Sequence, residues 1–216
     1  MAKYPIFLEL KGRRVVLIGA GTVAFRKATT LLEAGARVVI VAEHADPAVE
    51  LLCQKNTQAE LVKSSYAKEY LNGATLVIAA TNNRQLNKQI YHDCQNCGAL
   101  CNVADNPELC DFFAPAVLHR GDLQIAISTE GACPAYAGHI RKKLEDMFTD
   151  THAKFLSELG CLRAKVISEI PGADERKAVM GKLTDDASLE IFIASGADKW
   201  RQYADELISQ YTARSA

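Results

Sequence analysis

The hydrophobic pattern divides the first half of the chain into five short apolar runs separated by amphipathic stretches. The runs cover residues 15–18, 37–42, 59–63, 75–80 and 99–104. The run at 75–80 does not alternate with polar residues, which is typical of a strand in a parallel sheet covered on both faces. Apolar residues three and four positions apart predict helices from Thr22 to Gly35, over 46–55 and over 84–96. This alternation predicts a doubly wound α/β domain.

The first predicted helix is expected to bury a single apolar stripe. The stripe consists of Val23, Ala24, Ala28, Leu31 and Leu32, and the side chains expected to face solvent are Arg26, Lys27 and Glu33.

The pattern changes after residue 112. Apolar runs at 112–119 and 123–128 flank a turn-rich Arg120-Gly-Asp122, which predicts a β-hairpin. A helix is expected over roughly 134–148, and the chain from Thr151 onward is expected to be helical, with breaks at Pro171-Gly172 and Gly196. We therefore predict three parts, which cover residues 1–112, 113–150 and 151–216.

The first strand runs into Gly19-x-Gly21-x-x-Ala24, followed by a helix. In Rossmann-type domains this turn lets a pyrophosphate approach the backbone and the N-terminus of the helix. Glu43 follows the second strand, about 20 residues beyond the glycines, where a carboxylate accepts hydrogen bonds from a ribose. The spacing predicts a dinucleotide site, with NAD favoured over NADP by the charge of Glu43. His44 beside it weakens this preference slightly. A purely structural strand–helix turn is the alternative.

Composition narrows the class of protein. The formal net charge is −1, so nothing indicates a nucleic-acid or membrane surface, and no leader segment is expected at the N-terminus. The seven cysteines indicate reduced thiols and a cytoplasmic location. The spacing of Cys94, Cys97, Cys101 and Cys110 superficially resembles a metal site. We expect none, because the first two fall on a predicted helix and Cys101 on the next strand.

Asp105 stands just beyond the carboxyl end of the fifth predicted strand. An acid at this edge of the sheet can accept a proton while a bound cofactor accepts a hydride. The alternative is a plain turn at Asp105-Asn-Pro107, in which Asp105 caps its own backbone. Both interpretations stay open from spacing alone.

Several short motifs occur together in a fixed order. They are Pro5-Ile-Phe-Leu-x-Leu-Lys-Gly-Arg13, Gly19-x-Gly-x-Val-Ala-x-Arg-Lys27, Ala79-Ala-Thr-Asn82, Cys101-Asn-Val-x-Asp105, Phe113-x-Pro-Ala116, Gln124-Ile-Ala-Ile-Ser128 and Gly131-x-x-Pro134. Over residues 3–148 the set resembles the precorrin-2 dehydrogenase family of siroheme synthesis, some members of which are also sirohydrochlorin ferrochelatases. The resemblance implies oxidation of precorrin-2 to sirohydrochlorin with NAD⁺, and insertion of Fe²⁺ in bifunctional members.

The resemblance also implies roles for individual residues. Asp105 matches the aspartate of the family that serves dehydrogenation and metal insertion, and a homodimer is implied through the hairpin and helix after residue 112. The cofactor is implied to contact Gly19, Gly21, Thr22, Val23, Glu43, His44 and Thr81. The tetrapyrrole is implied to contact Asn102, Pro115, His119, Ser128, Thr129 and Gly131.

Physical chemistry agrees with such a substrate without singling out its ligands. A tetrapyrrole with acetate and propionate groups is polyanionic, so basic side chains and backbone N–H groups suit it. The candidate cations are Arg84, His119, Arg120, His139, Arg141 and Lys142. Each of them is equally explained as a solvated surface charge, and the hydroxyl groups of Ser128 and Thr129 as caps of the following helix.

Two other functions remain open. A Rossmann-type domain with a helical tail also suits a regulatory module that binds NAD and senses redox state without catalysis. Metal insertion alone, with Fe²⁺ or Co²⁺, is the third possibility. It would need a base and a metal donor, for which Asp105 with His119 or His139 are the candidates.

Overall fold

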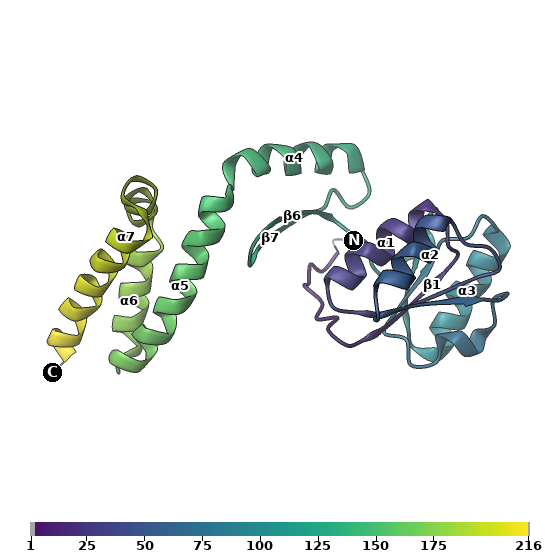
Figure 1. Cartoon of the computed structure of the whole chain (residues 1–216), viewed down its shortest axis with the longest axis horizontal. Coiled ribbons are helices and arrows are strands. Elements are labelled where there is room, and N and C mark those ends of the chain that lie inside the picture. Colours follow the sequence, from purple (N-terminus) through teal and green to yellow (C-terminus); the bar gives the residue numbers. More distant parts are fainter. Residues whose placement is uncertain (1–2, 216) are drawn as a thin grey trace. The chain divides into compact units, whose positions relative to one another are not determined.

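The computed structural model describes residues 3–215. The chain separates into two compact units, Met1–Ala114 and Pro115–Ala216. In Figure 1 the first unit runs from purple to blue-green and the second from green to yellow. The predicted boundary at residue 150 lies within the second unit, and the division into three parts stays a prediction.

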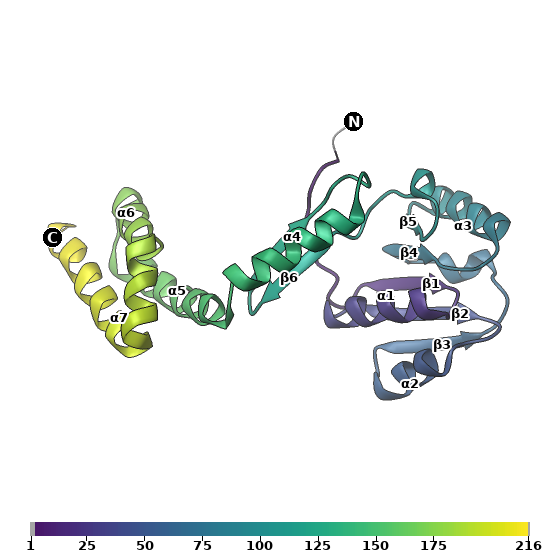
Figure 2. The same cartoon turned by 90° about the horizontal axis from the view of Figure 1, so that it is seen from above.

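The first unit contains one parallel sheet of five strands. The strands are β1 (Arg14–Ile18), β2 (Arg37–Ala42), β3 (Ala59–Lys63), β4 (Leu76–Ala79) and β5 (Leu100–Val103). Their order is β3-β2-β1-β4-β5, so the chain crosses from one side of β1 to the other between β3 and β4. Figure 2 shows the strands in this order. The predicted α/β fold is confirmed, with strand ends within a residue or two of those expected.

Both faces of the sheet are covered. The covering elements are α1 (Thr22–Glu33), α2 (Pro47–Lys55), the short 3-10 helix η1 (Lys68–Leu71) and α3 (Arg84–Cys97). Val15 and Leu17 pack with α1 and α2, whereas Val16 and Ile18 on the same strand pack with η1 and α3. Successive side chains of a strand point to opposite faces, so an apolar run without alternation is what a doubly covered sheet needs.

The buried stripe of α1 differs from the prediction at one residue. Val23 is 40% exposed, and Phe25 packs against the core together with Ala24 and Ala28. The helix starts directly at the glycine turn, which sets its rotation and points Val23 away from the sheet. Lys27, expected to face solvent, is half-buried, and this burial, followed by the charge of Arg26, lowers its pKa.

The second unit begins with the predicted hairpin, which is shorter than expected. Its strands are β6 (Ala116–Arg120) and β7 (Leu123–Ile127), joined by the expected turn, and α4 (Pro134–Met147) packs on β6. We expected the first strand to start at Phe112. Instead, the backbone carbonyl of Phe112 accepts a 2.9 Å hydrogen bond from Asn102 Nδ2, which ties this segment to the end of β5.

Three helices complete the second unit, and all were predicted as helical. They are α5 (Asp150–Glu169), α6 (Ala173–Leu183) and α7 (Asp186–Ser215). Trp200 is fully buried among them, packs against Phe155 and Phe192, and donates a 2.8 Å hydrogen bond to Ser188 Oγ. Gly196 interrupts α7 with a left-handed backbone, as its sequence position suggested. Within residues 3–215, no helix has the length and apolar character needed to traverse a bilayer.

Candidate cofactor-binding site

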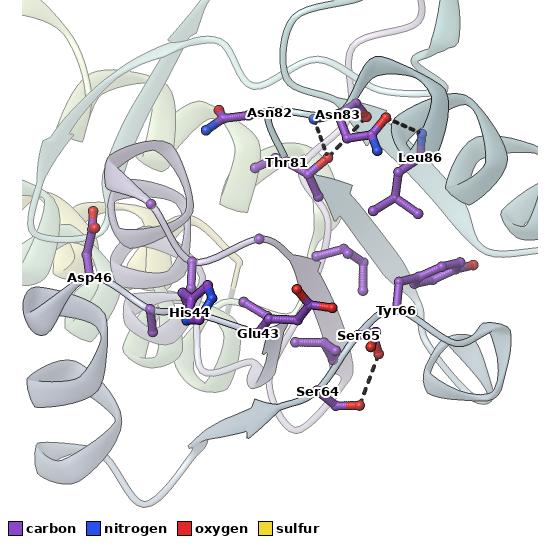
Figure 3. A pocket seen from close by; sticks show the side chains of 18 residues that line it. Glu43, His44, Asp46, Ser64, Ser65, Tyr66, Thr81, Asn82, Asn83 and Leu86 are labelled. Atoms are coloured by element: carbon purple, nitrogen blue, oxygen red, sulfur yellow. Dashed lines mark hydrogen bonds between the residues drawn. The ribbon is translucent and has the colours of Figure 1, made fainter.

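A pocket of the first unit lies at the carboxyl ends of its parallel strands. Its volume is about 840 Å³, and its walls come from the ends of β1, β2 and β4 and from the loop after β3. In Figure 3 Glu43 and His44 lie on one side of the pocket and the Thr81–Asn83 loop on the other. Open α/β sheets bind ligands at this edge, where the direction of chain winding reverses.

The two glycines of the motif are needed for different structural reasons. Gly19 has a φ of +105°, and a Cβ atom there would overlap the backbone carbonyl of Ala80. The chain's own backbone conformation and the neighbouring Ala80 therefore require glycine at this position. Its N–H donates a 2.9 Å hydrogen bond to the carbonyl of Val41. At Gly21 a Cβ atom would meet no protein atom within 4 Å. The space in front of Gly21 is therefore available to a ligand.

The helix that starts at this turn has an open N-terminus. Gly21 is the N-cap of α1 and supplies no side-chain hydrogen bond, and the first turn contains no acidic residue. The first backbone N–H groups of a helix have no partner within the helix, and the helix dipole adds positive potential there. By contrast, Asn83 caps α3 by accepting hydrogen bonds from the N–H groups of Gln85 and Leu86. The start of α1, rather than that of α3, suits a pyrophosphate.

Two carboxylates lie on the side of the pocket at the end of β2. Glu43 is exposed where the sequence predicts it, directly after the strand, with His44 beside it. Asp46, which sequence reasoning missed, also lines the pocket, and its N–H donates a 3.0 Å hydrogen bond to the carbonyl of Ala20. This bond holds the acidic loop against the glycine turn.

The loop after β3 supplies a further polar wall that the sequence analysis did not identify. Ser64, Ser65 and Tyr66 line the pocket. The rule that ligands bind at carboxyl ends of strands would have found them, because they directly follow β3. The phenol of Tyr66 donates a 2.8 Å hydrogen bond to Asp93 Oδ2, and burial together with this bond raises the pKa of Tyr66. Tyr66 is therefore a neutral hydrogen-bonding wall.

Thr81 and Asp105 are linked through one side chain. Thr81 lines the pocket, and its hydroxyl donates a 2.6 Å hydrogen bond to Asn87 Oδ1. Asn87 Nδ2 lies 3.5 Å from Asp105 Oδ1, and Arg84 Nε lies 3.8 Å from Asp105 Oδ2. The carboxylate is half-exposed, and the turn after β5 is capped instead by Asn106, whose Oδ1 accepts a hydrogen bond from the N–H of Glu108. Asp105 thus faces the helix α3 rather than its own turn.

The other predicted residues are placed as follows. Thr22 and Val23 lie in the first turn of α1 and do not line the pocket, and their backbone N–H groups are among those without a partner inside the helix. Asn102 is buried at the end of β5. The candidates of the second unit are Pro115, His119, Ser128, Thr129 and Gly131.

The two hydroxyls of the loop after β7 have backbone partners. Ser128 Oγ accepts a 3.1 Å hydrogen bond from the N–H of Glu130, and Thr129 Oγ1 accepts one of 3.3 Å from the N–H of Cys133. Cys133 is the N-cap of α4 and has no side-chain cap bond of its own. The hydroxyls therefore shape the loop that leads into α4.

The cysteines fall where the pattern placed them. Cys94 is buried on α3 and Cys101 on β5, and a hydrogen bond between their side chains, followed by burial, raises the pKa of Cys94. Among residues 3–215, no group of three or more His, Cys, Asp or Glu side chains is arranged to hold a metal ion. Buried neutral thiols act as small apolar side chains here.

Comparison with known proteins agrees with this geometry. Residues 6–116 match the family described as "Putative NAD(P)-binding", and residues 120–147 match the central part of sirohaem biosynthesis proteins. A siroheme synthase of Psychrobacter sp. (strain PRwf-1) is 31% identical over 97% of this chain and 43% of its own length. Siroheme synthase 1 of Aeromonas salmonicida (strain A449) is 34% identical over 96% of this chain and 44% of its own length.

A solved structure of SirC, a precorrin-2 dehydrogenase, has the same fold. It matches 94% of this chain and all of its own with a TM-score of 0.79 and 24% sequence identity. The chain spans less than half the length of the curated siroheme synthases named above. With a match over more than half of its residues, followed by the sirohaem central segment, the chain belongs to this family of NAD(P)-binding proteins related to siroheme synthases.

Proposed function

We propose that the protein oxidises precorrin-2 to sirohydrochlorin with NAD⁺. The observation that carries the proposal is the uncapped N-terminus of α1 at Gly21, which opens on a pocket of dinucleotide size beside the Thr81–Asn87–Asp105 group. The relatives named siroheme synthases supply the substrate class, because siroheme is made from a tetrapyrrole precursor.

The reaction removes one hydride and one proton from the substrate. The nicotinamide of a bound NAD⁺ supplies the hydride acceptor. Asp105 accepts the proton at a carboxylate oxygen, for which its half-exposed position at the end of β5 is suited. The N–H groups of the first turn of α1 bind the pyrophosphate, and Gly21 leaves room for it.

Two carboxylates support NAD rather than NADP as the cofactor. Glu43 and Asp46 lie on the same wall of the pocket, where a ribose hydroxyl can donate to a carboxylate. A 2′-phosphate would place two further negative charges beside them. His44 is the one side chain of this wall that could offset the repulsion.

The remaining parts of the proposal concern the tetrapyrrole and the oligomeric state, and all the residues involved except Asn102 lie in the second unit. We propose that Asn102, Pro115, His119, Ser128, Thr129 and Gly131 contact the tetrapyrrole and that the protein is a homodimer formed through the hairpin and α4. Val117 on β6 and Tyr136 on α4 are large apolar side chains exposed in the single chain, which supports such an interface. Insertion of Fe²⁺ or Co²⁺ as a substrate metal into the product, and a cytoplasmic location, belong to the same proposal.

The main alternative is an NAD-binding redox sensor without catalysis. It differs from an enzyme at Asp105, which a sensor does not need. We expect Asp105→Asn to bind NAD⁺ with unchanged affinity and to lose turnover of precorrin-2, because the amide keeps the shape of the carboxylate and cannot accept the proton. The matched control is Glu108→Gln, an exposed carboxylate in the same loop. Turnover that survives in Asp105→Asn would refute the catalytic role.

A further inference from the structure

Asn87 is a buried polar residue that the proposed reaction has not yet used. Its exposed fraction is 2%, and among residues 3–212 the other buried polar residues are Asn102 and Ser188. A buried amide destabilises a fold unless its donors and acceptor are bonded. The partners of Asn87 therefore indicate why it is placed here.

All the partners of the Asn87 amide lie at the rim of the proposed site. Its Oδ1 accepts the 2.6 Å hydrogen bond from Thr81 Oγ1, and its Nδ2 donates to the backbone carbonyl of Thr81 at 3.0 Å. The same Nδ2 lies 3.5 Å from Asp105 Oδ1. One side chain thus connects the loop after β4, which lines the pocket, with the loop after β5, which holds Asp105.

The helix α3 fixes Asn87 in this place. Asn83 caps the helix, and the N–H of Asn87 donates a 2.9 Å hydrogen bond to the carbonyl of Asn83. Arg84 is the charged group that faces Asp105, but its side chain is 89% exposed and 3.8 Å away. An exposed ion pair of this kind restrains a carboxylate weakly. Of these two neighbours of Asp105, the buried Asn87 is the one whose side chain is held in a fixed position.

We propose that Asn87 is a positioning residue for Asp105. This inference rests on the proposed dehydrogenation. Its amide holds the carboxylate at a set place relative to Thr81, and hence to the cofactor pocket. An amide N–H can only donate, so the oxygen that it meets must be an acceptor, which is the role of a carboxylate that takes a proton. Small displacements of a reacting group lower turnover strongly without changing the affinity for the cofactor.

Asn87→Asp tests this role with little change in shape. The carboxylate still accepts from Thr81 Oγ1 and loses both N–H donors. We expect kcat with precorrin-2 to fall by at least about tenfold while the Kd for NAD⁺ stays within about twofold of the wild type. Asn96→Asp is the control, because Asn96 is exposed on the same helix. Equal kcat values for Asn87→Asp and the wild type would overturn the proposal.

A second measurement needs neither turnover nor a stable variant at Asn87. In the cofactor-free wild type we expect the side-chain amide resonance of Asn87 in a ¹H–¹⁵N spectrum to move over the pH range in which carboxylates ionise. In Asp105→Asn it is expected to stay fixed. A resonance that does not titrate in the wild type, or that titrates equally in Asp105→Asn, overturns the contact between the two side chains.

The outcomes separate this inference from the function on which it rests. If the wild type binds NAD⁺ but forms no NADH from precorrin-2, the proposed function fails. If Asp105→Asn keeps its turnover, the catalytic role of Asp105 fails, and in either case the inference fails with it. If Asp105→Asn loses turnover while Asn87→Asp keeps it, only the role of Asn87 fails. Loss of turnover in both, with NAD⁺ affinity retained and a titrating Asn87 amide, supports both.

Discussion

The backbone carbonyl of Ala80 occupies the space in which a side chain of Gly19 would stand. A Cβ atom on Gly19 would lie 2.8 Å from the carbonyl carbon of Ala80, and the φ of Gly19 is +105°. The first motif glycine is thus required by the close approach of the turn after β1 to the end of the neighbouring strand β4. Only the second, Gly21, faces open space.

This difference predicts that alanine at the first glycine lowers the stability of the fold, whereas alanine at the second lowers the affinity for NAD⁺. Gly19→Ala is expected to lower the free energy of unfolding by about 2 kcal/mol or more, because it combines overlap with an unfavourable φ. Gly21→Ala is expected to change it by less than about 1 kcal/mol, since its backbone is extended, and to weaken NAD⁺ binding by about tenfold or more. Urea denaturation and calorimetric titration measure the two effects. Wild-type NAD⁺ affinity in Gly21→Ala would contradict the assignment.

Glu43 is predicted to set cofactor preference. Glu43→Ala removes a ribose acceptor and one of two negative charges on its wall of the pocket. We expect affinity for NAD⁺ to fall by about tenfold and discrimination against NADP⁺ to shrink, because a hydrogen bond to a charged group is lost together with the repulsion. Glu60→Ala, an exposed change on β3, serves as the control. A preference unchanged by Glu43→Ala would place the ribose elsewhere.

The helical part of the second unit is predicted to show a pH-dependent contact. Arg201 Nε on α7 donates a 2.7 Å hydrogen bond to Glu158 Oε2 on α5, and this bond lowers the pKa of Glu158 below its ordinary value of 4.5. A lowered carboxyl pKa stabilises the fold above the ordinary pKa, and this contribution is lost as the pH falls through the lower, folded-state value.

Glu158→Gln tests the sign of this effect. We expect the variant to be less stable than the wild type near pH 6 and the difference to shrink as the pH falls below about 4.5. Thermal unfolding across this range measures it. Glu206→Gln, an exposed change on α7, should show no such trend. A difference that grows on acidification would refute the attribution to Glu158.

Much of the first unit was predictable because its signals are local. The glycine turn, the unalternating strands and Glu43 after β2 each depend on neighbouring residues, and the parallel sheet follows from their alternation with helices. The start of the hairpin was predicted wrongly because the bond from Asn102 to the Phe112 carbonyl, which holds the segment at β5, joins residues ten apart.

The chemistry of the site was only partly readable from the sequence. Asp105 was predicted from its place after a strand and Thr81 from the family resemblance, but Asn87 lies within a helix and its polarity alone does not say that it is buried. Val23 was assigned to the core by helical spacing, whereas the actual rotation of α1 is set by its start at Gly21. Such features depend on tertiary contacts that a single sequence does not specify.

The central claim is tested most directly by an anaerobic assay of the protein with precorrin-2 and NAD⁺. We predict that NADH absorbance rises in step with the sirohydrochlorin spectrum, and that the Asp105→Asn variant binds NAD⁺ without producing either. Protein that demonstrably binds NAD⁺ yet forms no NADH from precorrin-2 would contradict the account and favour the redox sensor.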